Sequence, residues 1–275
     1  MRADLHVHTY YSDGLQSPDD VALLSKNNGV ELVAVTDHDT MLAYPELFAC
    51  CENRGVKAVR GIEVSAYYNG VRLHTLGYNI DPKHPVFGEF LKELYEGSLI
   101  RTDDILSKLK KNGVKITMDE VLKFRKNESA PVHAMYISRA AAQKGYCSSA
   151  FAFQKNYLSN GACAYSELGR PTPEKAVEVI TACSGFAVLA HPGRIELDKQ
   201  DVISLVKRLV CCGLSGIEAV YSTHTQLETA YYKEMALEYG LLVTGGSDTH
   251  FKDGNKKIGT PVFDCGSELC EKFGI

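Results

Sequence analysis

The sequence predicts an α/β fold in which a sheet of seven strands is flanked by helices and interrupted by an all-helical insertion. Three observations support this fold class. Short apolar runs alternate with capped helical segments along most of the 275 residues, which is typical of a parallel sheet. Histidine, aspartate or glutamate stands at the end of several of the apolar runs. Residues 82–170 carry helical patterns with no strand between them.

The predicted strands are short and stop at polar residues or glycine. Residues 32–35, 186–189 and 241–244 are clear examples. Because the carboxyl ends of parallel strands meet at one edge, the polar residues that follow them are expected to form the active face there, as in α/β barrels. The seven strands are expected to end near His8, Asp37, Glu63, Gly77, His191, Tyr221 and Gly246.

Capping residues and apolar stripes predict the helices. Ser17 and Thr172 are typical N-caps, and each is followed by a proline that suits the first helical position. Gly29 and Gly185 follow the apolar stripes of these two helices and are expected to lie beyond their ends. Further helices are predicted at residues 201–212 and 225–239.

Residues 82–170 are predicted to form the helical insertion, which leaves residues 1–81 and 171–275 for the barrel. The insertion departs after the predicted strand that contains His74 and returns before the strand that precedes His191. Both of its ends are therefore expected beside the active face, where the insertion would act as a lid. Its helical patterns cover residues 87–94, 100–109, 132–143 and 151–158.

Composition argues against several classes of protein. A net charge of −4 gives no basic surface for wrapping duplex nucleic acid, although a short nucleotide could bind locally. No apolar run is long enough to span a bilayer, and the charged N-terminus does not resemble a signal peptide, so a cytoplasmic protein without a membrane partner is expected. The nine cysteines show no Cys-x-x-Cys spacing and are assigned no chemistry.

Histidines and acids at the predicted strand ends indicate a metal centre. His6 and His8 are two residues apart at the end of a strand, so strand alternation points both rings to the same side. One such histidine is usually a solvated or hydrogen-bonded side chain, but the recurrence at four strand ends favours a multinuclear metal site that binds a phosphate or a carbonyl. The pattern recurs at His38, at His191 and at the pair Asp248 and His250.

These segments resemble the motifs of the PHP (polymerase and histidinol phosphatase) superfamily of metal-dependent phosphoesterases. The similarity is greatest to the branch with a helical insertion, whose members act on nucleotide phosphates or on the 5′ ends of short RNA. It implies a distorted (β/α)7 barrel that holds two or three divalent metal ions. The matching motifs are His6-Val7-His8, Tyr11-Ser12-Asp13-Gly14, Thr36-Asp37-His38-Asp39, Gly61-Ile62-Glu63, His74 before Leu76-Gly77-Tyr78, Ala190-His191-Pro192-Gly193-Arg194 and Gly246-Ser247-Asp248-Thr249-His250.

The resemblance implies three sets of metal ligands, with the Glu63 carboxylate shared between the first two. Ligands of nitrogen and oxygen suit Mn²⁺, Fe²⁺ or Zn²⁺. Metals about 3.5 to 4 Å apart can share a water and lower its pKa, so that hydroxide attacks the phosphate, with Glu63 and Asp248 as the catalytic carboxylates. The sets are His6, His8, Glu63 and Asp248; Glu63, His74 and His191; and Asp13, His38 and His250.

Other polar residues are candidates for substrate contacts. Arg194 is the first candidate for holding a phosphate oxygen with its planar guanidinium. A second anion contact is expected from the insertion or its border, at His133, Arg139 or Arg170. His224 is a candidate to contact substrate or to protonate the leaving group, with a surface position as the alternative for these residues. Asp37 and Asp39 are expected to orient imidazoles or to cap their loop.

The sequence therefore predicts a metal-dependent phosphatase or phosphodiesterase. Its expected substrate is a nucleoside monophosphate, a nucleoside 3′,5′-bisphosphate or the 5′ end of a short RNA, with inorganic phosphate or a mononucleotide as the product. One alternative substrate is histidinol phosphate. An alternative of another class is a noncatalytic module in which metal has a structural role, and the complete ligand set argues against it.

Overall fold

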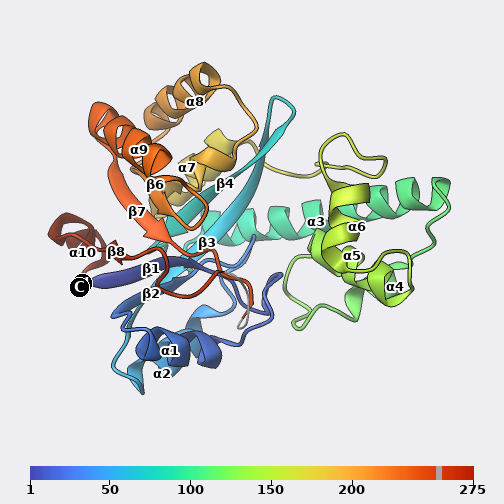
Figure 1. The fold of residues 1–275 in the computed structure, drawn as a ribbon, viewed down its shortest axis with the longest axis horizontal. Coiled ribbons are helices and arrows are strands. Elements are labelled where there is room, and N and C mark those ends of the chain that lie inside the picture. Colours follow the sequence, from blue (N-terminus) through green and yellow to red (C-terminus); the bar gives the residue numbers. More distant parts are fainter. Residues whose placement is uncertain (252–255) are drawn as a thin grey trace.

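A computed structural model describes residues 1–251 and 256–275. Its eight strands form one sheet in the order β7-β6-β5-β4-β3-β2-β1-β8 (Figure 1). The sheet curls into a nearly closed barrel, because Val7, the last residue of β1, bridges to Thr249 after β7. This architecture confirms the predicted α/β barrel. The strands are β1 (Arg2–Val7), β2 (Leu32–Val35), β3 (Lys57–Tyr68), β4 (Val71–Tyr78), β5 (Phe186–Leu189), β6 (Gly216–Tyr221), β7 (Leu242–Gly246) and β8 (Phe263–Asp264).

The sheet is mixed, so the expectation of a parallel sheet is wrong for β4 and for the short strand β8. Strand β4 runs antiparallel to both β3 and β5, and β8 runs antiparallel to β1. The reason lies in the connection between β3 and β4, which is a two-residue hairpin loop at Asn69 and Gly70. Their φ angles of 46° and 86° are both positive, as in the tight turns that join antiparallel strands.

Helices cover the barrel and separate its apolar core into layers. Side chains inside the barrel, such as Leu5, Leu76 and Tyr78, pack against α10 at the end away from the strand carboxyl termini. Ser17 and Thr172 cap α1 and α7 as predicted. The helices are α1 (Pro18–Asn27), α2 (Tyr44–Glu52), α3 (Pro85–Lys111), α4 (Met118–Leu122), α5 (Ala134–Gln143), α6 (Ala150–Phe153), α7 (Pro173–Ala182), α8 (Lys199–Cys211), α9 (Gln226–Tyr239) and α10 (Ser267–Phe273), with short turns η1 (Gln154–Leu158) and η2 (Pro192–Arg194).

The helical segment between β4 and β5 does not leave the barrel where we expected. Because β4 is antiparallel, its last residues lie beside the beginning of β3, and the amide of Asn79 donates to the carbonyl of Arg60 there. Helix α3 starts at this far end and runs back along the barrel for about 40 Å, at roughly 1.5 Å per residue. The end of the segment that rejoins the barrel lies at the active face, where the amide of Tyr67 donates to the carbonyl of Pro171.

Helix α3 belongs to two cores. Phe87, Phe90 and Leu94 pack into the core between the barrel and its outer helices. Ile105 and Leu109, about three turns further on, pack with α4, α5 and α6 in a separate core. The predicted helices at residues 87–94 and 100–109 are therefore one continuous helix, which carries the other helices to one side of the barrel (Figure 1). Among the described residues, no helix has the length and hydropathy to cross a membrane.

Candidate metal centre and substrate cavity

Five imidazoles surround the Glu63 carboxylate, which is 1% exposed. Its Oε1 lies 2.8 Å from His74 Nδ1, 3.0 Å from His191 Nε2 and 3.3 Å from His6 Nε2. Its Oε2 lies 3.1 Å from both His8 Nε2 and His38 Nδ1. Each oxygen therefore faces its own set of nitrogens, which is the arrangement that a carboxylate bridging two cations needs.

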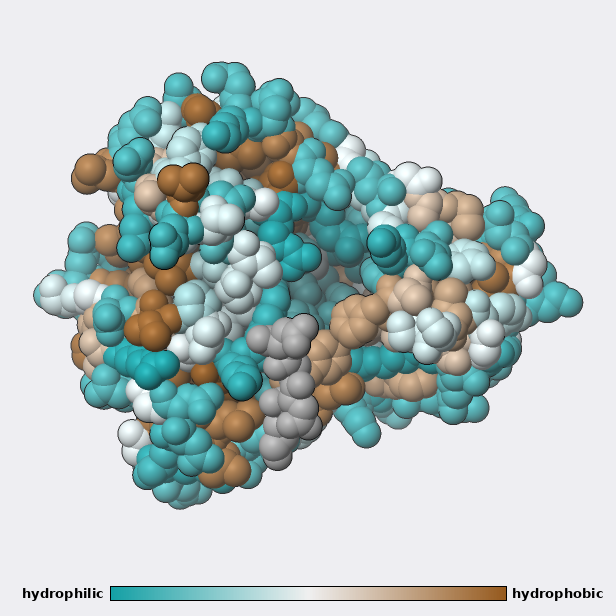
Figure 2. Space-filling view, in the orientation of Figure 1, coloured by the Kyte–Doolittle hydropathy of each residue, from teal (hydrophilic) through white to brown (hydrophobic). Residues whose placement is uncertain are grey.

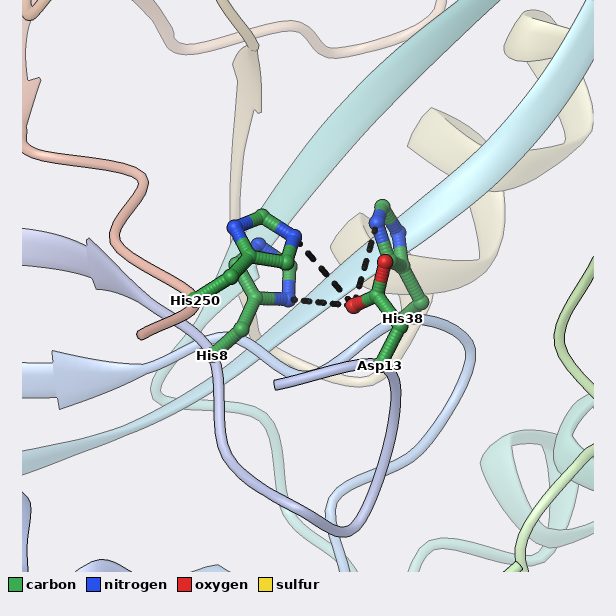
Figure 3. A group of neighbouring side chains, drawn as sticks. All are labelled: His8, Asp13, His38 and His250. Carbon is green, nitrogen blue, oxygen red and sulfur yellow. Dashed lines mark ion pairs between the residues drawn. The ribbon is translucent and has the colours of Figure 1, made fainter. Parts of the chain in front are cut away.

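Asp13 and Asp248 collect further imidazoles beside Glu63. Asp13 Oδ1 lies 3.2 Å from His250 Nε2, 3.8 Å from His8 Nδ1 and 3.9 Å from His38 Nε2 (Figure 3). Asp248 Oδ1 lies 3.3 Å from His8 Nε2 and 3.4 Å from His250 Nδ1. The four clusters that result contain all nine residues that the sequence predicts as ligands: His8, Asp13, His38 and His250; His6, His8 and Asp248; His6, Glu63 and His191; and His38, Glu63 and His74.

The grouping differs from the three expected sets because several residues lie between clusters. His8 and His38 each belong to two clusters, as do His6 and Glu63. In Figure 3 the Asp13 carboxylate points between the rings of His8, His38 and His250, so His8 joins the group that was expected to contain only the other three.

The polar atoms of this cluster fit divalent cations better than they fit one another. His6 Nε2 lies 3.2 Å from His8 Nε2, and His74 Nδ1 lies 3.3 Å from His191 Nε2, so ring nitrogens meet in pairs where at most one can donate. Within the described chain, the buried atoms Glu63 Oε2 and His191 Nδ1 have no hydrogen-bond partner. Converging imidazole and carboxylate lone pairs of this kind are the usual donors of transition-metal sites.

Electrostatics keep most of the cluster in the protonation states that bind metals. Burial raises the pKa of Glu63, but His74, His38 and His6 outweigh it, so the pKa lies well below its ordinary value. Burial lowers the pKa of His74 to about 4 against the attraction of Glu63. For His8, burial lowers the pKa, but hydrogen bonds to Asp248 and Glu63 outweigh it and raise the pKa to about 10. Metal binding is therefore expected to release protons.

Strained backbone holds some of these side chains at the strand ends. His191 and Asp248 have φ angles of 25° and 50°, and Asp39 beside His38 has 58°. Residues other than glycine rarely adopt positive φ, and such strain gathers at functional sites where surrounding contacts enforce it. An irregularity in β1 between Asp4 and Val7 accompanies the turn of His6 and His8 toward the cluster.

Glu218 on β6 supports the cluster from behind, and the sequence interpretation missed it. Its Oε1 lies 3.0 Å from His6 Nδ1, and its Oε2 accepts a 2.8 Å hydrogen bond from the backbone amide of His191. The sequence contained a signal for this role, because Glu218 is an acidic residue within an otherwise apolar strand. Of the two roles expected for Asp37 and Asp39, the structure shows the second, since they accept hydrogen bonds from the Thr9 and Ser65 amides and hold their loops.

Tyr221 and Lys256 hold the second oxygen of Asp248. Asp248 Oδ2 accepts 2.6 Å hydrogen bonds from the Tyr221 hydroxyl and from Lys256 Nζ. Arg194, the predicted phosphate contact, donates from Nη1 to the Tyr221 oxygen at 2.9 Å, and its side chain is 54% exposed. The Tyr221 hydroxyl therefore links the Arg194 guanidinium to Asp248 of the metal cluster. No motif predicted Lys256, which lies beyond the last of them.

A cavity of about 800 Å³ separates the metal cluster from the helical segment. Figure 2 shows the hollow between the two parts of the molecule, with hydrophilic residues at its floor. The volume is sufficient for a small-molecule ligand of nucleotide size. The helical segment and the chain that returns from it contribute His133, Met135, Phe151, Gln154, Ser159, Asn160, Tyr165 and Arg170 to the lining. The arginines and lysines among the described lining residues are Arg72, Arg170, Arg194 and Lys256.

Arg170 and Arg72 form a cationic zone in this cavity. The Arg170 side chain is 5% exposed and pairs with Glu167 through Nε. Arg72 donates to the same carboxylate from Nε at 2.8 Å. Arg170 Nη1 is 4.0 Å from Asp39 Oδ2 and has no hydrogen-bond partner among the described residues. A buried guanidinium with an unused donor favours an anionic partner in the cavity.

The remaining candidate contacts divide into one that lines the cavity and two that do not. His133 lines it, lies 3.5 Å from Asp13 Oδ2 and stacks on His38 with ring centroids 4.8 Å apart. Arg139 instead donates to the Asp13 carbonyl at 2.6 Å. Neither Arg139 nor His224 is among the described residues of the lining.

His224 also has a supporting position in place of the expected substrate contact. Its Nδ1 lies 3.0 Å from the Ala219 carbonyl, and its Nε2 accepts a hydrogen bond from the Gly193 amide at 3.2 Å. Because both ring nitrogens are bonded to backbone, the side chain braces the turn η2. Arg139 likewise supports the loop that carries Asp13, through the hydrogen bond from its Nη2.

Comparison with known proteins finds a family model, curated relatives and a solved structure that are similar to this chain. The family model described as PHP domain matches residues 4–210. The phosphoribosyl 1,2-cyclic phosphate 1,2-diphosphodiesterase of Eggerthella lenta is 33% identical over 261 residues, which cover 92% of this chain and 96% of that protein. The 3′,5′-nucleoside bisphosphate phosphatase of Chromobacterium violaceum is 28% identical over 257 residues, covering 93% and 90%. The solved structure of an amidohydrolase from Chromobacterium violaceum with bound sulfate has a TM-score of 0.88 and 26% identity, covering 99% of this chain and 97% of that one.

Proposed function

This chain belongs to the PHP domain family and is a metal-dependent hydrolase of phosphate esters, and we propose that its substrate is a small ribonucleotide that carries a second phosphate group. A nucleoside 3′,5′-bisphosphate and a short RNA with a 5′-phosphate belong to this class. The observation that carries the proposal is the buried Arg170, which lines the same cavity as the metal cluster and whose Nη1 has no hydrogen-bond partner among the described residues.

We assign the nine clustered residues to two or three divalent ions, with Mn²⁺, Fe²⁺ or Zn²⁺ all suited to the nitrogen and oxygen donors. Glu63 is placed to be shared between ions, since imidazoles face both of its oxygens. Bound there, the ions would activate water and neutralise charge on the reacting phosphate. Glu218 and Tyr221 would orient the ligands His6 and Asp248 through their hydrogen bonds.

The charged side chains of the cavity would orient the substrate at two places. Arg194 and Lys256, next to Asp248, are positioned to contact oxygens of the phosphate that reacts. Arg170 and Arg72 would hold the phosphate that does not react. Contacts to a group remote from the reaction can be used to position the reacting group, so they affect turnover as well as binding.

The names of the two curated relatives fit a substrate with two phosphates. Phosphoribosyl 1,2-cyclic phosphate carries a phosphate on its ribose besides the cyclic one, and a nucleoside 3′,5′-bisphosphate also carries two. Histidinol phosphate has an ammonium group instead of a second phosphate, and the guanidinium groups of Arg72 and Arg170 would repel it. The noncatalytic alternative does not hold, because the chain is a hydrolase.

The proposal is tested by measuring phosphate or mononucleotide release with added Mn²⁺. The panel consists of adenosine 5′-monophosphate, adenosine 3′,5′-bisphosphate, a 5′-phosphorylated RNA trinucleotide, phosphoribosyl 1,2-cyclic phosphate and histidinol phosphate. We expect kcat/KM to be highest for the bisphosphate or the trinucleotide and at least tenfold lower for the monophosphate. A higher kcat/KM for histidinol phosphate or for the monophosphate would contradict the proposal.

A further inference from the structure

An exposed phenylalanine of the helical segment lies at the cavity. Phe151 on α6 is 58% exposed, although it lines the cavity. Phe153, two residues on, is fully buried in the helical core and stacks on Tyr157 with ring centroids 4.5 Å apart. The buried ring anchors the short helix, so Phe151 is presented to the cavity at a fixed place.

A second phenylalanine meets Phe151 from the barrel. Phe251, which follows β7, also lines the cavity, and the two rings lie edge to face with centroids 5.6 Å apart. Phe251 is the next residue after His250 of the metal cluster, and their ring centroids are 6.2 Å apart. His250 in turn stacks on His8 at 4.1 Å. A series of rings therefore leads from the metal cluster to Phe151.

Two amide side chains of the helical segment line the cavity together with Phe151. Gln154 accepts a 2.8 Å hydrogen bond from the Ser138 hydroxyl, which fixes the orientation of its amide. Asn160 donates to Glu196 at 3.3 Å, and Glu196 belongs to the barrel side of the same lining. Aromatic faces next to orientable amides are the side-chain types that bind nucleobases, by stacking and by hydrogen bonds to the base edge.

We propose that Phe151 and Phe251 form an aromatic pair that stacks on the base of the substrate, with Gln154 and Asn160 beside the base edge. This inference rests on the proposed function and adds the part of the substrate that carries no phosphate. The aromatic pair and the cationic pair of Arg72 and Arg170 then divide the cavity between base and second phosphate. The enzyme therefore prefers substrates with a base over phosphoribosyl compounds that have two phosphates and no base.

The kinetic test compares adenosine 3′,5′-bisphosphate with phosphoribosyl 1,2-cyclic phosphate in Phe151→Ala and Phe251→Ala. Stacking of a base on an aromatic side chain is worth enough that we expect kcat/KM for the bisphosphate to fall at least tenfold, about 1.4 kcal/mol, mainly through KM. For the cyclic phosphate we expect a change below twofold. The matched control is Phe48→Ala on α2, which removes another partly exposed phenylalanine that packs on Tyr44 and is not part of the described lining.

Conservative variants separate stacking from simple apolar contact. Phe151→Tyr keeps an aromatic face and is expected to stay within twofold of the wild type on the bisphosphate. Phe151→Leu keeps an apolar side chain without that face and is expected to resemble Phe151→Ala. Equal losses on both substrates, or wild-type kinetics in Phe151→Leu, would overturn the proposal.

A binding measurement tests the aromatic pair without catalysis. We expect the fluorescence of 2-aminopurine riboside 3′,5′-bisphosphate to be quenched when it binds to chelator-treated wild-type protein, since the base stacks on aromatic rings. Quenching should disappear in the Phe151→Ala, Phe251→Ala double variant and persist in Phe48→Ala. If the wild type released no phosphate from any ester, the proposed function would fail, and the quenching would still decide whether the aromatic pair binds a base.

Discussion

The two walls of the cavity differ in how firmly the molecule holds their side chains. On the barrel wall, Glu63 and His6 are buried and have close polar neighbours on several sides. On the helical wall, Phe151 is largely exposed and Arg170 keeps an unused donor. The contrast supports our proposal that the barrel provides the reactive centre, whereas the helical segment provides groups that contact the substrate.

This difference between the two walls predicts the largest effect for a change on the barrel wall. Glu63→Ala removes the carboxylate that five imidazoles surround. We expect two metal sites to be lost together and kcat to fall at least about 10³-fold, because bound metal contributes several kcal/mol to the reaction. Metal analysis and phosphate release measure both quantities. Glu93→Ala, at an exposed ion pair with Lys175, is the control, and normal metal content in Glu63→Ala would refute the bridging role.

A change at Glu218, behind the metal cluster, should also weaken metal binding, but by a smaller factor. Glu218→Gln weakens the bond to His6 Nδ1 while keeping the size of the side chain. Partners of this type typically alter metal affinity or activity by about 10- to 100-fold. Titration of the chelator-treated variant with Mn²⁺ measures the affinity. An affinity equal to that of the wild type would show that Glu218 serves only the fold.

A change on the helical side should alter selectivity more than chemistry. Arg170→Ala removes the cation proposed to hold the second phosphate, and one charged hydrogen bond is worth about 1.5–3 kcal/mol. We expect kcat/KM for adenosine 3′,5′-bisphosphate to fall at least tenfold and that for adenosine 5′-monophosphate to change less than threefold. Arg208→Ala, which breaks a surface pair with Glu174, is the control. Equal losses on both nucleotides would mean that Arg170 only stabilises the fold.

Point variants test the helical side more cleanly than replacing residues 82–170 with a linker. The first turns of α3 place Phe87, Phe90 and Leu94 in the core of the barrel. Removing them would expose apolar surface on the barrel, and each buried large side chain contributes about 2–5 kcal/mol. A loss of activity in the deletion variant would therefore not distinguish the missing lid from a destabilised barrel.

The last prediction concerns stability and not activity, through the pH dependence at Glu167. Burial raises the pKa of this carboxyl, but Arg170 and Arg72 outweigh it, so its folded pKa lies below the ordinary value near 4.5. A depressed carboxyl pKa stabilises the fold above the unfolded pKa, and this stability is lost as the pH falls through the folded pKa. Glu167→Gln should therefore lower the free energy of unfolding by about 3 kcal/mol at pH 7 and by less at acid pH. Denaturant unfolding at both pH values measures the difference, and a constant difference would contradict the assignment.

The barrel wall was more predictable from sequence than the helical wall. Strand alternation at His6 and His8, and the repetition of histidines after strands, are local signals, and the structure brings all these residues together. The direction of β4 was also encoded locally, in the Asn69-Gly70 turn, but the alternation of strands and helices suggested a parallel sheet. Reading that dipeptide as a hairpin would have placed the start of α3 at the far end of the barrel.

The helical wall depends on tertiary contacts that leave little trace in the sequence. The pattern of apolar residues predicted most of its helices but not that α3 is continuous. Gly97 and Gly169 approach so closely that a side chain at either position would collide with the other backbone, and this contact sets where the returning chain and Arg170 lie. The contact of Phe151 with Phe251 likewise joins residues that are far apart in the chain.

The central claim is that a metal cluster on the barrel wall performs the reaction. The most direct measurement adds Mn²⁺ back to chelator-treated wild-type protein while recording both bound metal and phosphate release from adenosine 3′,5′-bisphosphate. We predict no release without metal and full activity only after at least two ions are bound per chain. Activity that persists in the absence of bound metal, or that is complete with a single ion, would contradict the claim.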